Sequence, residues 1–123
     1  MARVLIIDDD PDTMAILQQA LNSAGYEVIL AADGREGMMR HRASPADLVI
    51  TDMPIQDGME TIREMHLCFP EVAIIAVSGR PDSGTMMSIA QNLPAVRILG
   101  KPFAADELIA AAANALGRQS QAQ

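Results

Sequence analysis

The sequence predicts an α/β fold, a doubly wound five-stranded parallel sheet with helices on both of its faces. Five short aliphatic runs have the length and composition of buried strands, and they span residues 4–7, 27–31, 47–52, 72–77 and 96–99. A segment with apolar residues at helical spacing follows each run. Because strands and helices alternate along the chain, we expect a parallel sheet with both faces covered.

The length and net charge of the chain exclude several classes of function. The chain has 123 residues, the length of one domain, and a formal net charge of −7. Such an acidic chain is not expected to bind nucleic acid directly or to attach to an anionic membrane surface. There is no signal-peptide pattern and no apolar run long enough to span a bilayer, and the one cysteine, Cys68, cannot form an internal disulfide. We therefore expect a cytoplasmic protein.

Capping residues predict where the helices begin and end. Side chains that can accept hydrogen bonds from a first helical turn stand at Asp10, Asp33, Asp57 and either Asp82 or Ser83. A glutamate three residues after Asp33 and after Asp57 makes a capping box at each. Pro11 falls in the first turn, where proline costs least. Gly25 and Gly117 are expected to end the first and last helices, leaving residues 118–123 as a polar tail or the start of a linker.

Several residues that often carry chemistry are given structural roles. His41 and His66 fall on expected helices without the spacing of metal ligands, so both are expected at the surface. Cys68 is expected to be a partly buried packing residue. The methionine pairs at 38–39 and 86–87 are expected in the core and at its boundary, a partner surface on the fourth helix being the lesser alternative.

Polar residues follow four of the five strands. Asp8 and Asp9 follow the first strand, Asp52 ends the third, Ser78 follows the fourth and Lys101 follows the fifth. Because the carboxyl ends of parallel strands lie at one edge of the sheet, these five side chains should converge. Three carboxylates in one cleft repel one another, and Mg²⁺, which prefers carboxylate oxygens, would relieve that repulsion. Lys101 could pair with Asp52 or with phosphate oxygens.

These segments together resemble the receiver domain of two-component response regulators. The resemblance covers roughly residues 3–117, which gives an expected receiver domain at residues 1–117, and it implies a flavodoxin-like (βα)5 fold with strand order 2-1-3-4-5. Its motifs are Val-Leu-Ile-Ile-Asp8-Asp9, Asp47-Leu-Val-Ile-Thr-Asp52, Met53-Pro54 with Asp57-Gly58, Ala76-Val77-Ser78-Gly79, and Lys101-Pro102-Phe103.

The resemblance also implies a role for each residue of the site. Asp52 would take a phosphoryl group from a histidine kinase or phosphotransfer protein, and Asp8, Asp9 and Asp52 would hold Mg²⁺. Lys101 would contact a phosphoryl oxygen, its bond to Pro102 would be cis, and the Ser78 hydroxyl would move to another oxygen.

The resemblance further implies how the signal leaves the domain. The output would be a changed surface on the fourth helix, fifth strand and fifth helix, read by an effector protein or an output domain. Transfer and autodephosphorylation would be self-catalysed, so the chain would not be an enzyme in the usual sense. It would be a monomer or a phosphorylation-dependent dimer.

The sequence departs from the family pattern at two places. Met53-Pro54 follows Asp52 directly, so the loop to Gly58 is two residues shorter than usual. The backbone carbonyl expected to bind the metal then belongs to Pro54, whose φ is fixed, and we expect weaker Mg²⁺ binding or slower phosphorylation. Ile98 replaces the usual tyrosine or phenylalanine, so the signal would pass through Ser78, with Arg80 influencing water access to the phosphoryl group.

Three other functions are weighed against the phosphoacceptor switch. A degenerate receiver would bind partners without phosphorylation, which the short loop favours and the five-residue constellation opposes. An aspartyl-phosphate hydrolase would use the same residue types, but its pattern has a second aspartate two residues after the nucleophile, on the first strand, and a cap domain. A nucleotide-binding module is disfavoured, because the sequence has no Gly-rich phosphate-binding loop.

Overall fold

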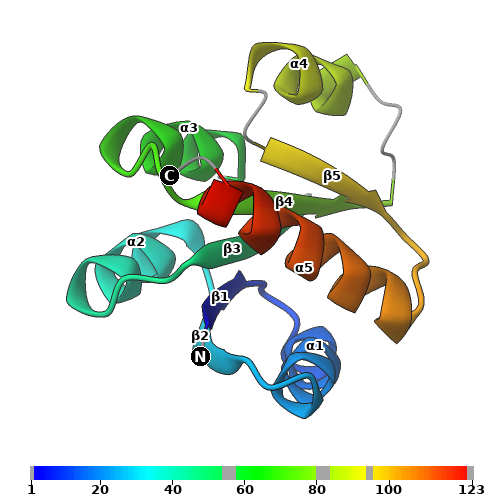
Figure 1. The fold of residues 1–123 in the computed structure, drawn as a ribbon. Coiled ribbons are helices and arrows are strands. Elements are labelled where there is room, and N and C mark those ends of the chain that lie inside the picture. Colours follow the sequence, from blue (N-terminus) through cyan, green and yellow to red (C-terminus); the bar gives the residue numbers. More distant parts are fainter. Residues whose placement is uncertain (1, 54–57, 80–83, 94–95, 122–123) are drawn as a thin grey trace.

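The computed structural model describes residues 2–53, 58–79, 84–93 and 96–121. Strands and helices alternate through these residues, and the strands form one parallel sheet in the order β2-β1-β3-β4-β5 (Figure 1). The strands are β1 (Arg3–Ile7), β2 (Glu27–Ala31), β3 (Leu48–Met53), β4 (Ala73–Ser78) and β5 (Val96–Gly100). The helices are α1 (Pro11–Ser23), α2 (Gly34–Ala43), α3 (Gly58–Cys68), α4 (Gly84–Asn92) and α5 (Ala105–Gln121). The predicted fold class and strand order are confirmed.

The sheet separates two apolar layers. Because successive side chains of a strand point to opposite faces, Val4 and Ile6 pack with α1 and α5, whereas Leu5 and Ile7 pack with α2, α3 and α4. All four of these β1 side chains are at most 1% exposed. Burying an aliphatic side chain of this size stabilises a fold by about 1.5–3 kcal/mol, so the unbroken apolar runs hold the sheet between its helices.

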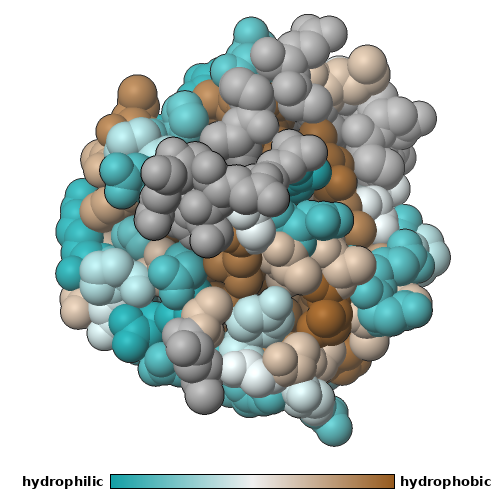
Figure 2. All heavy atoms as spheres, in the orientation of Figure 1, coloured by the Kyte–Doolittle hydropathy of each residue, from teal (hydrophilic) through white to brown (hydrophobic). Residues whose placement is uncertain are grey.

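The outer surface carries both polar and apolar side chains. Polar side chains predominate along the left edge of Figure 2, on the side where α2 and α3 lie in Figure 1, and apolar side chains gather toward the middle of the same view. None of the described helices is both long enough and apolar enough to cross a membrane.

Helix α1 begins and ends as its sequence predicts. The Asp10 carboxylate accepts hydrogen bonds from the Asp12 amide at 3.2 Å and the Thr13 hydroxyl at 2.6 Å, and Pro11 occupies the first turn. Gly25, just past the end of the helix, has a φ of 96°, a conformation in which a side chain would be strained. Asp33 caps α2 in the same way, accepting from the Glu36 amide at 2.8 Å. The expected caps of the third and fourth helices, at residues 57 and 82–83, lie outside the described residues.

The last helix is longer than predicted. Gly117 does not end it, because α5 continues to Gln121, so the expected polar tail is helical through that residue. Gly25 is the glycine with a positive φ in the described part of the chain, and Gly117 keeps a helical backbone. A glycine that stays helical costs about 1 kcal/mol relative to alanine without stopping the helix, and this one is tolerated.

Helix α2 contains a glycine that its packing requires. A Cβ atom on Gly37 would lie 2.5 Å from Ile7 Cδ1 and 2.9 Å from Ile7 Cγ1, and Ile7 is fully buried on β1. The missing side chain therefore lets α2 pack directly on the sheet beside the strand that leads to Asp8. This close approach explains the glycine at position 37 of α2.

Gly37→Ala should lower the free energy of unfolding by about 1–2 kcal/mol, because the overpacking cost exceeds the gain in helix propensity. Gly117→Ala is the matched control: a Cβ atom added there would have no neighbour within 4 Å, so the same change should stabilise the protein by up to about 1 kcal/mol. Denaturant unfolding of both variants measures the contrast. Ile7→Val, which removes the clashing methyl, should recover part of the loss in the double variant. Equal effects at the two glycines would refute the close-packing explanation.

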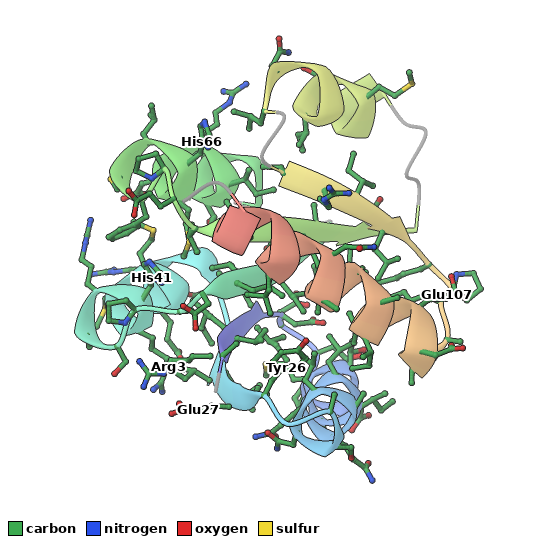
Figure 3. The ribbon with its side chains drawn as sticks, viewed as in Figure 1. Arg3, Tyr26, Glu27, His41, His66 and Glu107 are labelled. Carbon is green, nitrogen blue, oxygen red and sulfur yellow. The ribbon has the colours of Figure 1, made fainter. Side chains whose placement is uncertain are left out.

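His41 is expected at the surface from its sequence, but it is buried in the structure. It lies on α2 (Figure 3) and is 3% exposed. Its Nδ1 accepts a hydrogen bond from the Ala46 amide at 3.0 Å, and its ring meets the Phe69 ring edge-on at a centroid distance of 4.3 Å. The side chain thus joins α2 to the segment before β3 and to the end of α3. Burial lowers the pKa of His41, which keeps the ring neutral and able to accept the amide hydrogen bond.

The lowered pKa of His41 gives stability a defined pH dependence. Below pH about 6.5 the unfolded chain takes up a proton that the folded chain resists, so stability should fall as pH drops toward the folded-state pKa, by at most about 1.4 kcal/mol per pH unit. Unfolding measured between pH 7.5 and 5 should show this slope in the wild type and not in His41→Asn, whose amide oxygen replaces Nδ1 as acceptor. His66→Asn, the matched control, should retain the slope. A slope that persists in His41→Asn would contradict the assignment.

Other side chains also differ from expectation. Cys68 is exposed, and Met39 and Met87 are 61% and 51% exposed instead of lining the core. His66 is partly buried. Met38 is buried as expected, so only one member of the first methionine pair packs inside. The exposed positions fall on the outer stripes of their helices, where hydrophobic type alone does not decide burial.

Candidate functional site

Strand register brings the predicted site residues to one edge of the sheet. Ile7 on β1 pairs with Thr51 on β3, so Asp8 and Asp52 are the next residues along neighbouring strands. Ser78 pairs with Met53 on one side and Gly100 on the other, which places Asp52, Ser78 and Lys101 beside one another. Parallel topology alone predicts this convergence, and the structure shows it.

Three carboxylates meet at this edge. Asp8, Asp9 and Asp52 each offer an oxygen, and these three oxygens lie within 4.8 Å of one another. Their environments differ: Asp8 is fully buried, Asp52 is partly buried and Asp9 is exposed. The cluster therefore runs from the interior of the protein to the solvent, with Asp52 in the middle.

Asp8 is held by the backbone around it. Its amide donates to the Ala31 carbonyl at 3.1 Å, and its Oδ1 accepts from the Asp10 amide at 2.9 Å. Burial raises the pKa of Asp8, and the negative charges of Asp52 and Asp9 add to that rise, while the Asp10 amide and the Lys101 ammonium oppose it. Oδ2 of Asp8 is buried and has no hydrogen-bond partner among the described residues.

The donor set fits a hard divalent cation. A buried carboxylate oxygen without a partner is costly, and a cation bound between the three carboxylates would supply the missing interaction. Oxygen donors from two or three carboxylates, with solvent on one side, are what Mg²⁺ prefers. Asp8, Asp9 and Asp52 are the residues that would hold it. The Pro54 carbonyl, the fourth expected ligand, lies outside the described residues.

Lys101 closes the other side of the site. Its ammonium forms an ion pair with Asp52 Oδ1 at 2.5 Å, and this oxygen is buried with no hydrogen bond of good geometry to a described residue. The Lys101 amide donates to the Ser78 carbonyl at 2.7 Å, which fixes the end of β5 against the end of β4. The Lys101–Pro102 bond is cis, as predicted. The Asp52 carboxylate thus lies between the acidic cluster and one positive charge.

Ser78 lies at the end of β4 and is 5% exposed. The next residue, Gly79, is exposed, and a Cβ atom there would have no neighbour within 4 Å. Arg80, the residue expected to influence water access, lies outside the described residues. Ile98 on β5 is partly buried and packs against the core layer beneath α4, so the residue that replaces the usual aromatic ring is part of the hydrophobic packing.

Sequence reasoning missed the floor of the site. Thr13 and Leu17 from α1 and Phe103 from the segment before α5 line a narrow space of about 10 Å³ beneath Asp8 and Asp52. That volume is about the smallest that could admit one water molecule. Ile6, Ile7, Ile50 and Val77 complete the lining, and such apolar surroundings strengthen the electrostatic interactions of Asp52 with its neighbours. Phe103 already belongs to the Lys101-Pro102-Phe103 motif, and its apolar type there is the signal that could have assigned it to this floor.

Comparisons with known proteins give the family. The family model of the response regulator receiver domain matches residues 4–113. Response regulator MprA of Mycolicibacterium vanbaalenii is 34% identical over 110 residues, which cover 88% of this chain and 47% of that protein. The C4-dicarboxylate transport transcriptional regulatory protein DctD of Rhizobium meliloti is 35% identical over 114 residues, which cover 91% of this chain and 25% of that protein.

A solved structure agrees along the whole length. The receiver domain protein (CheY-like) from Methanospirillum hungatei JF-1 has a TM-score of 0.92 and 27% identity, with 100% of this chain and 99% of that chain covered. The present chain spans about half or less of the length of the two curated relatives. The chain belongs to the response regulator receiver domain family, and it is thus a signalling domain of the two-component type.

Proposed function

We propose that this receiver domain is a phosphorylation-controlled switch in which Asp52 accepts a phosphoryl group in the presence of Mg²⁺. The observation that carries the proposal is the position of Asp52, a partly buried carboxylate between the acidic cluster of Asp8 and Asp9 and the ammonium of Lys101. Such a site can both present a nucleophilic oxygen and stabilise the negative charge of a bound phosphoryl group.

The chain's own groups have distinct tasks in the transfer. A carboxylate oxygen of Asp52 attacks the phosphorus of a phosphohistidine donor; a P–O bond forms as the P–N bond breaks, and the imidazole leaves with the bonding electron pair. Mg²⁺, when bound, supplies positive charge beside the phosphoryl oxygens. Lys101 moves its ion pair from the Asp52 carboxylate to a phosphoryl oxygen. The Ser78 hydroxyl donates to another phosphoryl oxygen and displaces the segment that follows β4.

The partners follow from this chemistry. The donor is a histidine kinase or a phosphotransfer protein, and the downstream partner is an effector protein or an output domain that reads the surface of α4, β5 and α5. The relatives support this pairing, since they include the sensor histidine kinase TmoS of Ectopseudomonas mendocina, 33% identical over 117 residues that cover 12% of that protein. Self-catalysed loss of the phosphoryl group would end the signal, in the cytoplasm, where the exposed Cys68 thiol stays reduced.

The proposal is tested by incubating the protein with a small acyl phosphate and Mg²⁺ and measuring its intact mass. The wild type should gain one phosphoryl group, the gain should disappear when Mg²⁺ is chelated, and Asp52→Asn should gain none. A wild type that gains nothing with any donor or metal would instead support the degenerate receiver, the alternative that the short loop after Asp52 favours. Asp52→Asn should fold as stably as the wild type, which separates lost chemistry from lost structure.

A further inference from the structure

A groove between α2 and α3 lies apart from the phosphorylation site. The two helices pack against each other on the sheet face opposite α1 and α5 (Figure 1). The groove has a volume of about 340 Å³. Its lining includes Arg35, Met39 and Arg42 from α2, and Glu60 and Glu64 from α3.

The two walls of the groove carry opposite charge. Arg35, Met39 and Arg42 are spaced four and three residues apart, so they form one stripe along α2, and Glu60 and Glu64 form a matching stripe along α3. All four charged residues are exposed. The ion pairs within the described part of the chain join Arg3 to Glu27, Arg40 to Glu36 and Lys101 to Asp52. Among those same residues, the charges along the groove therefore have no ion-pair partner.

Each of the two helices also carries an exposed apolar side chain, Met39 in the groove and Leu67 beyond its end on α3. Met39 is 61% exposed in the middle of the α2 stripe, and Leu67 is 79% exposed one turn beyond Glu64 on α3. Leu67 is among the most exposed large hydrophobic side chains in the described residues. Apolar contact at the centre of a charged rim is the usual composition of a protein interface.

The charge balance of this face favours a second copy of the chain as its occupant. A net charge of −7 makes two copies repel each other over most approaches. The groove, however, carries two positive and two negative side chains, so this face is locally neutral. A partner of one charge sign would be attracted by one wall and repelled by the other, whereas an identical copy can satisfy both.

The directions of α2 and α3 are compatible with a two-fold axis between two copies of the chain. Both α2 and α3 return the chain from the carboxyl edge of a parallel sheet to its amino edge, so they run in the same direction. A two-fold axis running along the groove, parallel to both helices, would lay α2 of one copy parallel on α3 of the other. Arg35, near the start of α2, would then face Glu60 of the second copy, and Arg42, near the end of α2, would face Glu64. The same pairs would recur on the other side of the axis.

We propose that the face formed by α2 and α3 is a homodimer interface, closed by reciprocal pairing of the α2 arginines with the α3 glutamates of a second copy. Two helices of ten or eleven residues are about 15 Å long and cover less area than a standard interface, so the dimer is weak and transient. It does not depend on phosphorylation, because no residue of the site takes part in it. The Asp52→Asn variant should therefore dimerise like the wild type.

The test is sedimentation equilibrium of three charge variants at low ionic strength. Arg35→Glu/Arg42→Glu makes the face wholly acidic, and Glu60→Arg/Glu64→Arg makes it wholly basic. Each alone should associate at least about tenfold more weakly than the wild type, since like charges then face each other. Mixed together, the two should form a one-to-one heterodimer at least as tight as the wild-type dimer. The quadruple swap keeps the net charge of the wild type and should restore homodimerisation.

The sedimentation results distinguish this interface from a monomer and from a dimer that uses another face. Raising the salt concentration should weaken the wild-type dimer and the mixed heterodimer alike. The proposal would be overturned if the wild type stayed monomeric up to millimolar concentration. It would also be overturned if the acidic and basic variants dimerised as the wild type does, because the contact would then lie on another face. Because all four residues are exposed, each variant should keep the unfolding free energy of the wild type within about 0.5 kcal/mol.

Discussion

Asp8→Asn should make the metal-free protein more stable while removing its response to Mg²⁺. Asp8 is fully buried, one of its oxygens has no hydrogen-bond partner among the described residues, and its carboxylate shares a 4.8 Å cluster with Asp9 and Asp52. Two charges at that separation repel by roughly 3 kcal/mol at an effective dielectric constant of 20. Lys101 already offsets part of this repulsion. We therefore expect a gain of about 1–2 kcal/mol at neutral pH, read from denaturant unfolding in the presence of a chelator.

The difference in stability between Asp8→Asn and the wild type should depend on pH. Burial raises the pKa of Asp8 above its ordinary value of 3.8. A raised pKa contributes stability that is fully present at pH values below the ordinary value and is lost as pH rises through the folded-state pKa. The advantage of Asp8→Asn over the wild type should accordingly be small near pH 4, grow as pH rises and level off above the folded-state pKa of Asp8.

Added Mg²⁺ should reverse the order of stability. A cation that binds the folded state raises the unfolding free energy of the wild type with its concentration, and Asp8→Asn should show almost none of this rise. Asp12→Asn is the matched control, since Asp12 is an exposed aspartate in the first turn of α1 outside the cluster. It should leave both the metal-free stability and the Mg²⁺ response unchanged. An Asp8→Asn protein that is less stable than the wild type without metal would contradict the account of a strained acidic cluster.

Lys101→Ala should slow phosphorylation of Asp52 by about 10²–10³-fold, the usual effect of removing one positively charged or donating group from a transition state that gains negative charge. The ammonium forms an ion pair with Asp52 Oδ1 at 2.5 Å, so it is close to where the phosphoryl oxygens would lie. The rate of intact-mass gain with an acyl phosphate and saturating Mg²⁺ measures the effect.

Two further variants separate charge from packing at this position. Lys101→Arg keeps the charge but not the compact geometry, and it should recover only part of the rate. Lys101→Met keeps most of the stem and should be as slow as Lys101→Ala. If Lys101→Met transferred at the wild-type rate, the lysine charge would have no part in the reaction.

Topology was predictable because each element carries a local signal that agrees with the whole fold. The apolar runs that end at Ile7 and at Asp52 are central strands, and Asp10 and Gly25 mark the start and the end of α1 as their chemistry requires. Gly117 shows the limit of such signals. Glycine permits a helix to end but does not make it end, and nothing in the residue itself distinguishes the two cases.

Burial was predicted less well than topology. His41 stands between two arginines, which suggests an exposed position, but it also lies three residues after Met38 on the inner face of α2. The helical period was the better guide than the residue type. The buried acceptor role of its Nδ1 depends on the Ala46 amide and on Phe69, and these contacts arise only when α2 and α3 pack on the sheet.

The sequence was enough to predict which residues form the candidate site, but not how deeply each of its carboxylates is buried. Parallel register brings Asp8, Asp52, Ser78 and Lys101 to one edge whatever the details of packing. That Asp8 is buried with an unsatisfied oxygen in the described structure, while the adjacent Asp9 is exposed, depends on the turn into α1. A sequence does not reveal which of two neighbouring aspartates turns inward.

The central claim is that Asp52 carries the phosphoryl group, and chemical trapping of the acyl phosphate tests it most directly. Borohydride reduces an aspartyl phosphate to the primary alcohol of homoserine and leaves free carboxylates intact. The protein is therefore phosphorylated with an acyl phosphate and Mg²⁺, reduced, digested and analysed by peptide mass. We expect homoserine at position 52 and at no other aspartate, and only when Mg²⁺ is present. Homoserine at Asp8 or Asp9, or a phosphorylated protein whose Asp52 peptide is unchanged, would contradict it.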